Sequence, residues 1–265
     1  MTTIEAPPGH PGLLRHAGGA AVLGAALTGL AAWGSVPLLA GVVVVQLVLV
    51  LGFLALVDAP AALGVFVIGT AGALASDVVV HVGHGRVGGL TGVVALSFVA
   101  GLLLQLLRRH RSRVTESLAD TLVVAVLVSC AATLPAAVQH DSGTWVVRVG
   151  LTAASVALVL SRALEGFRGE LHGLPCLTTA LVAGPTAALL VAGDHLSIRQ
   201  ALLLGLAAAA AAASGDQLTD LAGEDLAEQP QDDRRLASLR PVTLLLPFAL
   251  VAPVLLAAVR LIEGS

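Results

Sequence analysis

Carboxylates gather in one polar stretch, residues 214–240, between two long apolar blocks. If the preceding helix continues into this stretch, Asp216, Asp220 and Glu224 are spaced four residues apart and project from one helix face. Oxygen ligands at that spacing suit Mg²⁺, a hard cation that often bridges to substrate phosphates. An acidic, solvated loop has the same composition. Spacing alone therefore leaves a metal site and a solvated loop both open.

A second group lies at the end of the third apolar block. Asp77, His81 and His84 occupy positions i, i+4 and i+7, which share one face of a helix. Two imidazoles and a carboxylate could hold Zn²⁺ or another transition metal. However, Gly83 and Gly85 are expected to end the helix there. Simple contact of these side chains with water and lipid head groups is the competing interpretation.

The remaining charges lie near the ends of apolar blocks. The basic run 108–113 could contact anionic lipid at about 1 kcal/mol per residue. Arg148 and Arg162 lie near the two ends of one block, where both could snorkel to an interface. Glu165 is three residues after Arg162, close enough to pair with it. No charge is expected in the middle of the membrane, which argues against a proton-coupled pump or an ion channel.

Composition excludes a water-soluble domain. Of the 265 residues, 57% are hydrophobic and 12% charged, against about 45–50% and about 25% in soluble domains. The mean hydropathy is +0.94. With 3% aromatic residues and no basic stripe, nucleic-acid binding is not expected. Lys, Asn and Tyr are absent, which is typical of a GC-rich, bacterial genome.

The apolar residues form nine blocks of the length that crosses a bilayer, about 20 residues each. The sequence thus predicts an all-α, polytopic integral membrane bundle of about nine transmembrane helices. A polar N-terminal segment, 1–17, precedes a single transmembrane domain, 18–265, that includes a cytoplasmic loop, 214–240. The nine blocks lie near 18–34, 36–57, 61–80, 87–107, 118–138, 144–164, 174–193, 198–214 and 241–262.

Arginine distribution predicts the orientation in the plasma membrane. With the N-terminus in the cytoplasm, ten of the 14 basic residues fall in cytoplasmic segments and four outside. Basic short loops stay on the cytoplasmic side. The N-terminus is therefore expected inside and the C-terminus outside, as an odd number of crossings requires.

Small residues fill the eighth block, which ends in Gly215-Asp216 and a polar loop. This arrangement resembles the eighth-helix region of the phosphatidate cytidylyltransferases (CDP-diacylglycerol synthases). The likeness extends to the helix start at 141–145, to Ala153-Ala154-Ser155 and to 246–252. The resemblance implies nine crossings, a lipid partner, and the conversion of CTP and phosphatidate to CDP-diacylglycerol and pyrophosphate. It places Mg²⁺ on Asp216 and Asp220.

Departures from the family pattern predict a diverged, non-catalytic member. The family follows its Ala-Ser with Asp-Thr-Gly, whereas Ser155 is followed by Val156-Ala157-Leu158. Both lysines of the next motif are missing at 174–178. Arg162 would be the one surviving cation of the catalytic set. Phosphoryl transfer needs cations around the moving phosphate, so their loss should remove most of the rate.

The resemblance also predicts a geometry. Asp216 should lie near Ser155, Arg162 and Pro175, opposite an apolar wall formed by Val156, Cys176 and Leu177. If activity is lost, the chain could instead serve as a structural partner subunit, and a second copy of itself is a candidate partner. A small-solute transporter is the alternative from another class. It would need polar residues or broken helices near mid-membrane, and Pro135 and Pro185 interrupt two blocks.

Overall fold

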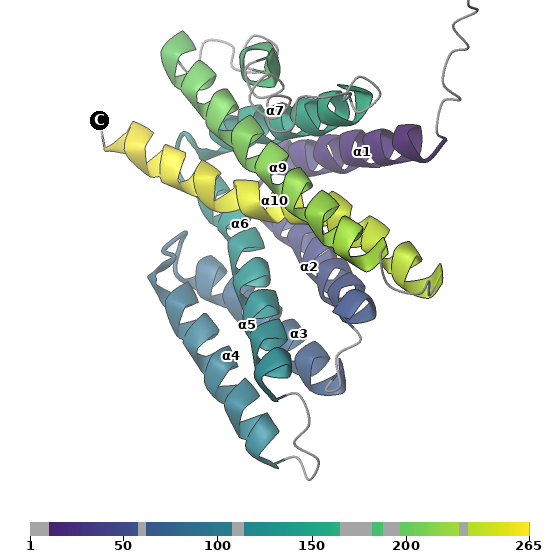
Figure 1. Cartoon of the computed structure of the whole chain (residues 1–265). Coiled ribbons are helices and arrows are strands. Elements are labelled where there is room, and N and C mark those ends of the chain that lie inside the picture. The colour runs from purple at the N-terminus through teal and green to yellow at the C-terminus, as the bar shows by residue number, and fades with distance from the viewer. Residues whose placement is uncertain are drawn as a thin grey trace, which may run out of the picture.

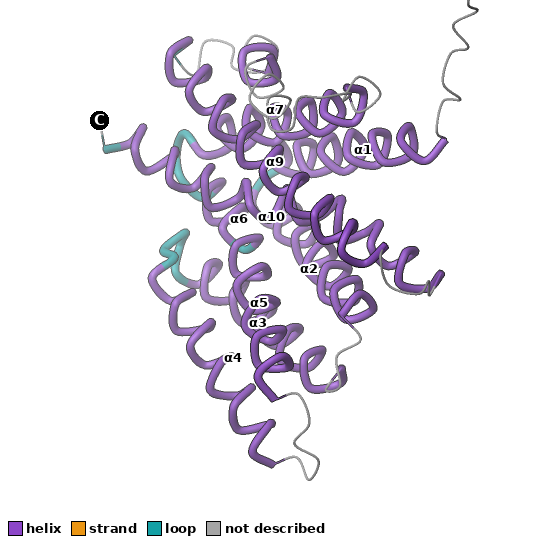
Figure 2. Tube along the Cα trace, viewed as in Figure 1, coloured by secondary structure: helices purple, strands orange, loops and turns teal. Residues whose placement is uncertain are grey.

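Every regular element that the computed structural model describes is an α-helix (Figures 1 and 2). The described residues are 11–57, 62–107, 114–164, 182–187, 197–227 and 233–264. The helices are α1 (Pro11–Trp33), α2 (Ser35–Val57), α3 (Ala62–Val82), α4 (Gly88–Leu107), α5 (Val114–Ala131), α6 (Thr133–Val138), α7 (Gly143–Leu164), α9 (Ile198–Ala227) and α10 (Asp233–Glu263). Residues 182–187 form a further helical segment.

Seven stretches of the described helices are long and apolar enough to cross a membrane. They lie in α2, α3, α4, α5 with α6, α7, α9 and α10, whereas the apolar part of α1, Ala17–Trp33, is shorter. The all-α membrane bundle is thus confirmed by length and composition. Most of the predicted block 174–193 lies outside the described residues. The number nine stays a prediction.

Three predicted boundaries differ from the helices in the structure. Helix α1 begins at Pro11 rather than near residue 18, since proline is well tolerated in the first helical turn. The block 118–138 is divided at Ala132 into α5 and α6, three residues before Pro135, which lacks the N–H that a continuous helix needs. The polar stretch 214–240 is mostly helical, because α9 continues to Ala227 and α10 begins at Asp233. Helix α9 therefore continues past Asp216, which is the condition under which Asp216, Asp220 and Glu224 share one helix face.

The helices form two groups that share α2 and α10. Helices α3, α4 and α5 pack against one another, and α1, α7 and α9 form the second group, with α7 between the other two. Helix α10 contacts α2, α5, α7 and α9 and so joins the groups (Figure 1). Gly34, with φ +124°, forms the turn between α1 and α2.

Close contacts at glycines give the relative directions of the helices. Gly24 of α1 lies against Ser155 of α7 and Phe248 of α10, and Gly150 of α7 lies against Leu255 of α10. Along α7, residue numbers therefore rise while those of the contacted residues in α10 fall. Helices α7 and α10 are antiparallel.

Helix α9 also runs antiparallel to α10. Gly215 packs against Pro247, while Gln200 and Leu261 line one groove near the opposite ends of the two helices. Helices α7 and α9 are consequently parallel, so the last residue of α7 and the first residue of α9 lie at opposite ends of the bundle (Figure 1). At one end lie the starts of α1, α3, α5 and α10 and the ends of α2, α4, α7 and α9.

Candidate functional site

Four polar side chains are buried where α2, α3 and α5 meet, and we call them the buried polar cluster. They are Gln46, Ser76, Asp77 and Ser129, with exposed fractions of 0%, 0%, 3% and 6%. Small residues of α3, Gly69, Gly72 and Ala73, are buried in the two turns before this cluster, and they let neighbouring helices approach closely. Polar groups buried among membrane helices need hydrogen-bond partners, so their pairing decides what the cluster can do.

Gln46 joins the three helices. Its Nε2 donates to the Val128 carbonyl of α5 at 2.9 Å and to Asp77 Oδ1 of α3 at 3.3 Å. The hydroxyls of Ser76 and Ser129 are 3.1 Å apart and share a hydrogen bond. Two acceptors remain: Gln46 Oε1 and Asp77 Oδ2 are buried and have no hydrogen-bond partner among the described residues. The buried polar cluster is therefore rich in oxygen acceptors and poor in donors.

The cluster lies beside the break between α5 and α6. The Val128 carbonyl that accepts from Gln46 also accepts from the Ala132 backbone N–H at 3.1 Å, where the helix is interrupted. The Thr133 hydroxyl caps the Cys130 carbonyl at 2.6 Å. A broken helix at this depth is tolerated because protein, rather than lipid, surrounds it.

One expectation about charges is corrected here. The sequence places Asp77 at the outer end of its block and predicts no charge in the middle of the membrane. In the structure, Asp77 is buried between helices and accepts a hydrogen bond from Gln46, which lies at the midpoint of α2. Gln46 was missed altogether. The available signal was a single amide in the otherwise apolar stretch 36–57, where an uncompensated polar group would be costly.

The structure does not bring Asp77, His81 and His84 together as a metal site. Helix α3 ends at Val82 and Gly83 follows in a turn, so the expected helix end is confirmed. Both histidines are exposed, and His84 Nδ1 lies 3.0 Å from the Val82 carbonyl oxygen. Asp77 points into the bundle instead. Within the described ranges, no three His, Cys, Asp or Glu side chains are grouped to hold a metal ion.

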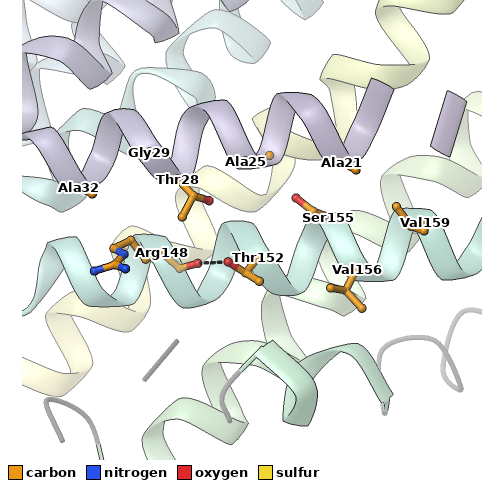
Figure 3. Close-up of a pocket in the computed structure, with 11 residues that line it drawn as sticks. Ala21, Ala25, Thr28, Gly29, Ala32, Arg148, Thr152, Ser155, Val156 and Val159 are labelled. Carbon is orange, nitrogen blue, oxygen red and sulfur yellow. Dashed lines mark hydrogen bonds between the residues drawn. The ribbon is translucent and has the colours of Figure 1, made fainter. Parts of the chain in front are cut away.

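A pocket of about 490 Å³ lies between α1 and α7 (Figure 3). We call it the α1–α7 pocket. Its α1 wall is built almost wholly of small residues, of which Ala21, Ala25 and Gly29 are exposed on the bundle surface. The full lining is Ala21, Gly24, Ala25, Thr28, Gly29, Ala32, Arg148, Thr152, Ser155, Val156 and Val159.

The polar groups of this pocket lie mainly on α7. Arg148 is half-buried, its guanidinium carbon 4.5 Å from the centre of the Trp145 ring. Its Nε is buried without a hydrogen-bond partner in the part of the chain that the structure describes, as is the Thr28 hydroxyl. Thr152 and Ser155 donate to carbonyls of their own helix at 2.8 and 2.7 Å. The pocket therefore combines one cation with a long apolar trough.

Glycine at position 24 is what lets the pocket form. A Cβ added there would overlap the Ser155 hydroxyl and lie 2.8 Å from Ser155 Cβ. The small residues Ala20, Gly24 and Thr28, spaced four apart on α1, thus face other helices, with Ala20 also buried. Small side chains at these positions allow the two backbones to approach.

For the predicted catalytic residues, the structure describes only the helix in which each one lies. Asp216 and Asp220 lie in α9 and Arg162 in α7, and these two helices pack together. Nothing is described of the three side chains. The other expected neighbours, Pro175, Cys176 and Leu177, lie outside the described residues, as do the basic run 108–113 and Glu165. Val156 does line a pocket, next to Ser155.

No protein-family model, no curated protein and no solved structure matches this chain.

Proposed function

We propose that this protein binds an anionic phospholipid and is a non-catalytic membrane protein of the phosphatidate cytidylyltransferase type. The observation that supports this most is the α1–α7 pocket, a trough of small apolar residues with one guanidinium near its end (Figure 3). Such a pocket is complementary to an acyl chain that carries a phosphate at one end. The expected ligands are thus membrane lipids, among them phosphatidate, the substrate of the family that the chain resembles.

Arg148 supplies the selectivity for an anion. Its stacking on Trp145 holds the guanidinium plane and leaves the in-plane N–H groups for a ligand. The Nε has no partner among the described residues, and a phosphate oxygen would satisfy it. Arginine presents a planar fork that matches phosphate geometry, which a zwitterionic head group fills less well.

The pocket lining also favours loss of catalysis. Val156 stands where the resemblance expects an aspartate, and its isopropyl group lines the pocket directly after Ser155. A carboxylate removed from this wall leaves no group there to hold a metal ion. If activity were retained, Asp216 and Asp220 would hold Mg²⁺ and Arg162 would face the nucleotide phosphates.

We further propose nine crossings of the plasma membrane, with the N-terminus cytoplasmic and the C-terminus outside. The seven long helices, α1 and the block 174–193 would make the nine. The parallel directions of α7 and α9 support an additional crossing between them. The end of the bundle that carries the start of α1 also carries the start of α10, with Arg234 and Arg235. Basic residues at that end favour the cytoplasmic side.

Replacement of Arg148 tests the lipid proposal. The full chain, purified in detergent and offered equimolar phosphatidate and phosphatidylcholine, is expected to retain phosphatidate preferentially in native mass spectra. Arg148→Gln should lower the retained phosphatidate about tenfold, because a hydrogen bond to a charged group contributes about 1.5–3 kcal/mol. Retention of phosphatidylcholine should not change.

Arg260→Gln is the matched control, since Arg260 is exposed in the last turn of α10 and does not line the pocket. It should leave phosphatidate retention unchanged. Equal retention of the two lipids by the unaltered protein, or equal losses in the two arginine variants, would contradict a specific site at Arg148.

An enzymatic assay tests the non-catalytic part. With CTP, phosphatidate and Mg²⁺, the purified protein is expected to form no CDP-diacylglycerol, because the cations that phosphoryl transfer requires are missing from the sequence. An active phosphatidate cytidylyltransferase, assayed in parallel, controls for substrate quality. Turnover that Asp216→Ala abolishes would instead establish the protein as an enzyme.

A small-solute transporter is the second candidate. The features that such a protein needs are an interrupted helix and polar side chains deep in the bundle. The break between α5 and α6 beside Gln46 and Asp77 has both. Uptake of a solute into vesicles containing the protein, driven by a pH gradient, would favour this candidate over lipid binding alone.

A further inference from the structure

We infer that Asp77, held by Gln46, is a proton-binding site inside the bundle. The Asp77 side chain is 3% exposed and that of Gln46 is fully buried. One carboxyl oxygen of Asp77 accepts from Gln46 Nε2, while the other, Oδ2, has no partner in the described part of the chain. Uptake of one proton on Oδ2 converts the carboxylate to a neutral acid and leaves the Gln46 hydrogen bond in place. The step needs no other reactant.

The helices packed around Asp77 offer no cation that would take the place of the proton. Helices α2, α4 and α6 contain no ionisable residue. Helix α5 contributes only Glu116, Asp120 and the thiol of Cys130. On α3 itself, His81 lies one turn beyond Asp77 and is exposed. A buried carboxylate without a positive partner is expensive in a membrane, so the neutral acid is the favoured form.

The acidic residues of α5 lie at another level of the bundle. Helices α3 and α5 are parallel, since Ser76 contacts Ser129 and Gly69 contacts Val124. Asp120 precedes Val124 by one turn and so lies nearer the other end of α3, with Glu116 farther still. Both positions are at least two helical turns along α5 from Ser129. The half-buried Cys130 follows Ser129, and its thiol carries no positive charge in any state.

The break between α5 and α6 could alter the hydrogen bonding around Asp77. The Val128 carbonyl is shared between Gln46 and the Ala132 backbone N–H at that break. A shift of α6 would alter the carbonyl that holds Gln46 and, through it, the surroundings of the Asp77 carboxyl. Asp77 and Arg148 lie on different helices, α3 and α7, so the two sites can be tested by separate substitutions.

Infrared difference spectroscopy on the full chain in lipid vesicles at neutral pH tests the inference. The unaltered protein is expected to show the carbonyl band of a protonated carboxylic acid. Asp77→Asn should remove this band, and the matched Asp120→Asn and Asp141→Asn variants should retain it. Gln46→Leu should retain the band but shift it to higher frequency, because one hydrogen bond to the acid is lost.

Several outcomes would overturn the inference. They are the absence of the band from the unaltered protein, its persistence in Asp77→Asn, and its loss when K⁺ in the buffer is replaced by Na⁺, which would assign the site to a metal cation. If Asp77→Asn fails to fold, as judged by gel filtration, the band shift in Gln46→Leu decides. An unshifted band in Gln46→Leu would show that Gln46 does not donate a hydrogen bond to the protonated acid, and this would contradict the inference.

Discussion

A cysteine placed at Ser142 is expected to react with a membrane-impermeant maleimide added to intact cells, whereas one placed at Ser238 is not. The variants are Ser142→Cys and Ser238→Cys in a chain from which Cys130 and Cys176 have been removed. Ser142 lies in the turn between α6 and α7, and Ser238 lies in the first turns of α10, toward the opposite end of the bundle. The expected difference is all or none, because the proposed orientation puts the two positions on opposite sides of the membrane.

Permeabilised cells supply the control, since both cysteines should then react. Asp141→Cys, at an exposed position of the same turn, serves as a second outside probe. Labelling of Ser238→Cys alone in intact cells would reverse the orientation. It would also place Asp216 and Asp220 on the side away from cytoplasmic nucleotides.

Gly205→Val is expected to produce a large loss of stability. Gly205 of α9 and Gly184 of the helical segment 182–187 touch backbone to backbone. A Cβ on Gly205 would lie 2.5 Å from the Gly184 carbonyl oxygen and 2.8 Å from its Cα, so the two helices must separate. Overpacking of this kind costs about 3 kcal/mol, which corresponds to a fall of about 6–12 °C in the thermal midpoint. Circular dichroism of the protein in detergent measures it.

Gly92→Val is the matched control for this substitution. Gly92 is exposed on α4, and a Cβ there would meet no atom within 4 Å. The same change of helix propensity is therefore tested without a clash. Equal midpoints for Gly205→Val and Gly92→Val would show that the contact between Gly205 and Gly184 does not stabilise the bundle.

The candidate sites were visible in the sequence to different degrees. Arg148 and Asp77 stood out as charges within apolar blocks, yet their surroundings did not. Asp77 was grouped with His81 by helical spacing, but the helix turns His81 outward while burying Asp77. Helical spacing indicates which residues share a helix face, but it does not indicate where the neighbouring helices stop covering that face. His81, one turn after Asp77, is therefore exposed although Asp77 is buried.

Composition and block length by themselves determined that this chain is a set of apolar helices, and the positions of Pro135 and Gly83 indicated one helix break and one helix end. That much follows because backbone groups in lipid must be satisfied within each helix. Only the tertiary structure decided which faces meet. Lipid-facing and buried faces of a membrane helix are equally apolar, so hydrophobic periodicity does not distinguish them. Gln46 and Asp77, 31 residues apart, therefore become one site only when α2 and α3 are packed together.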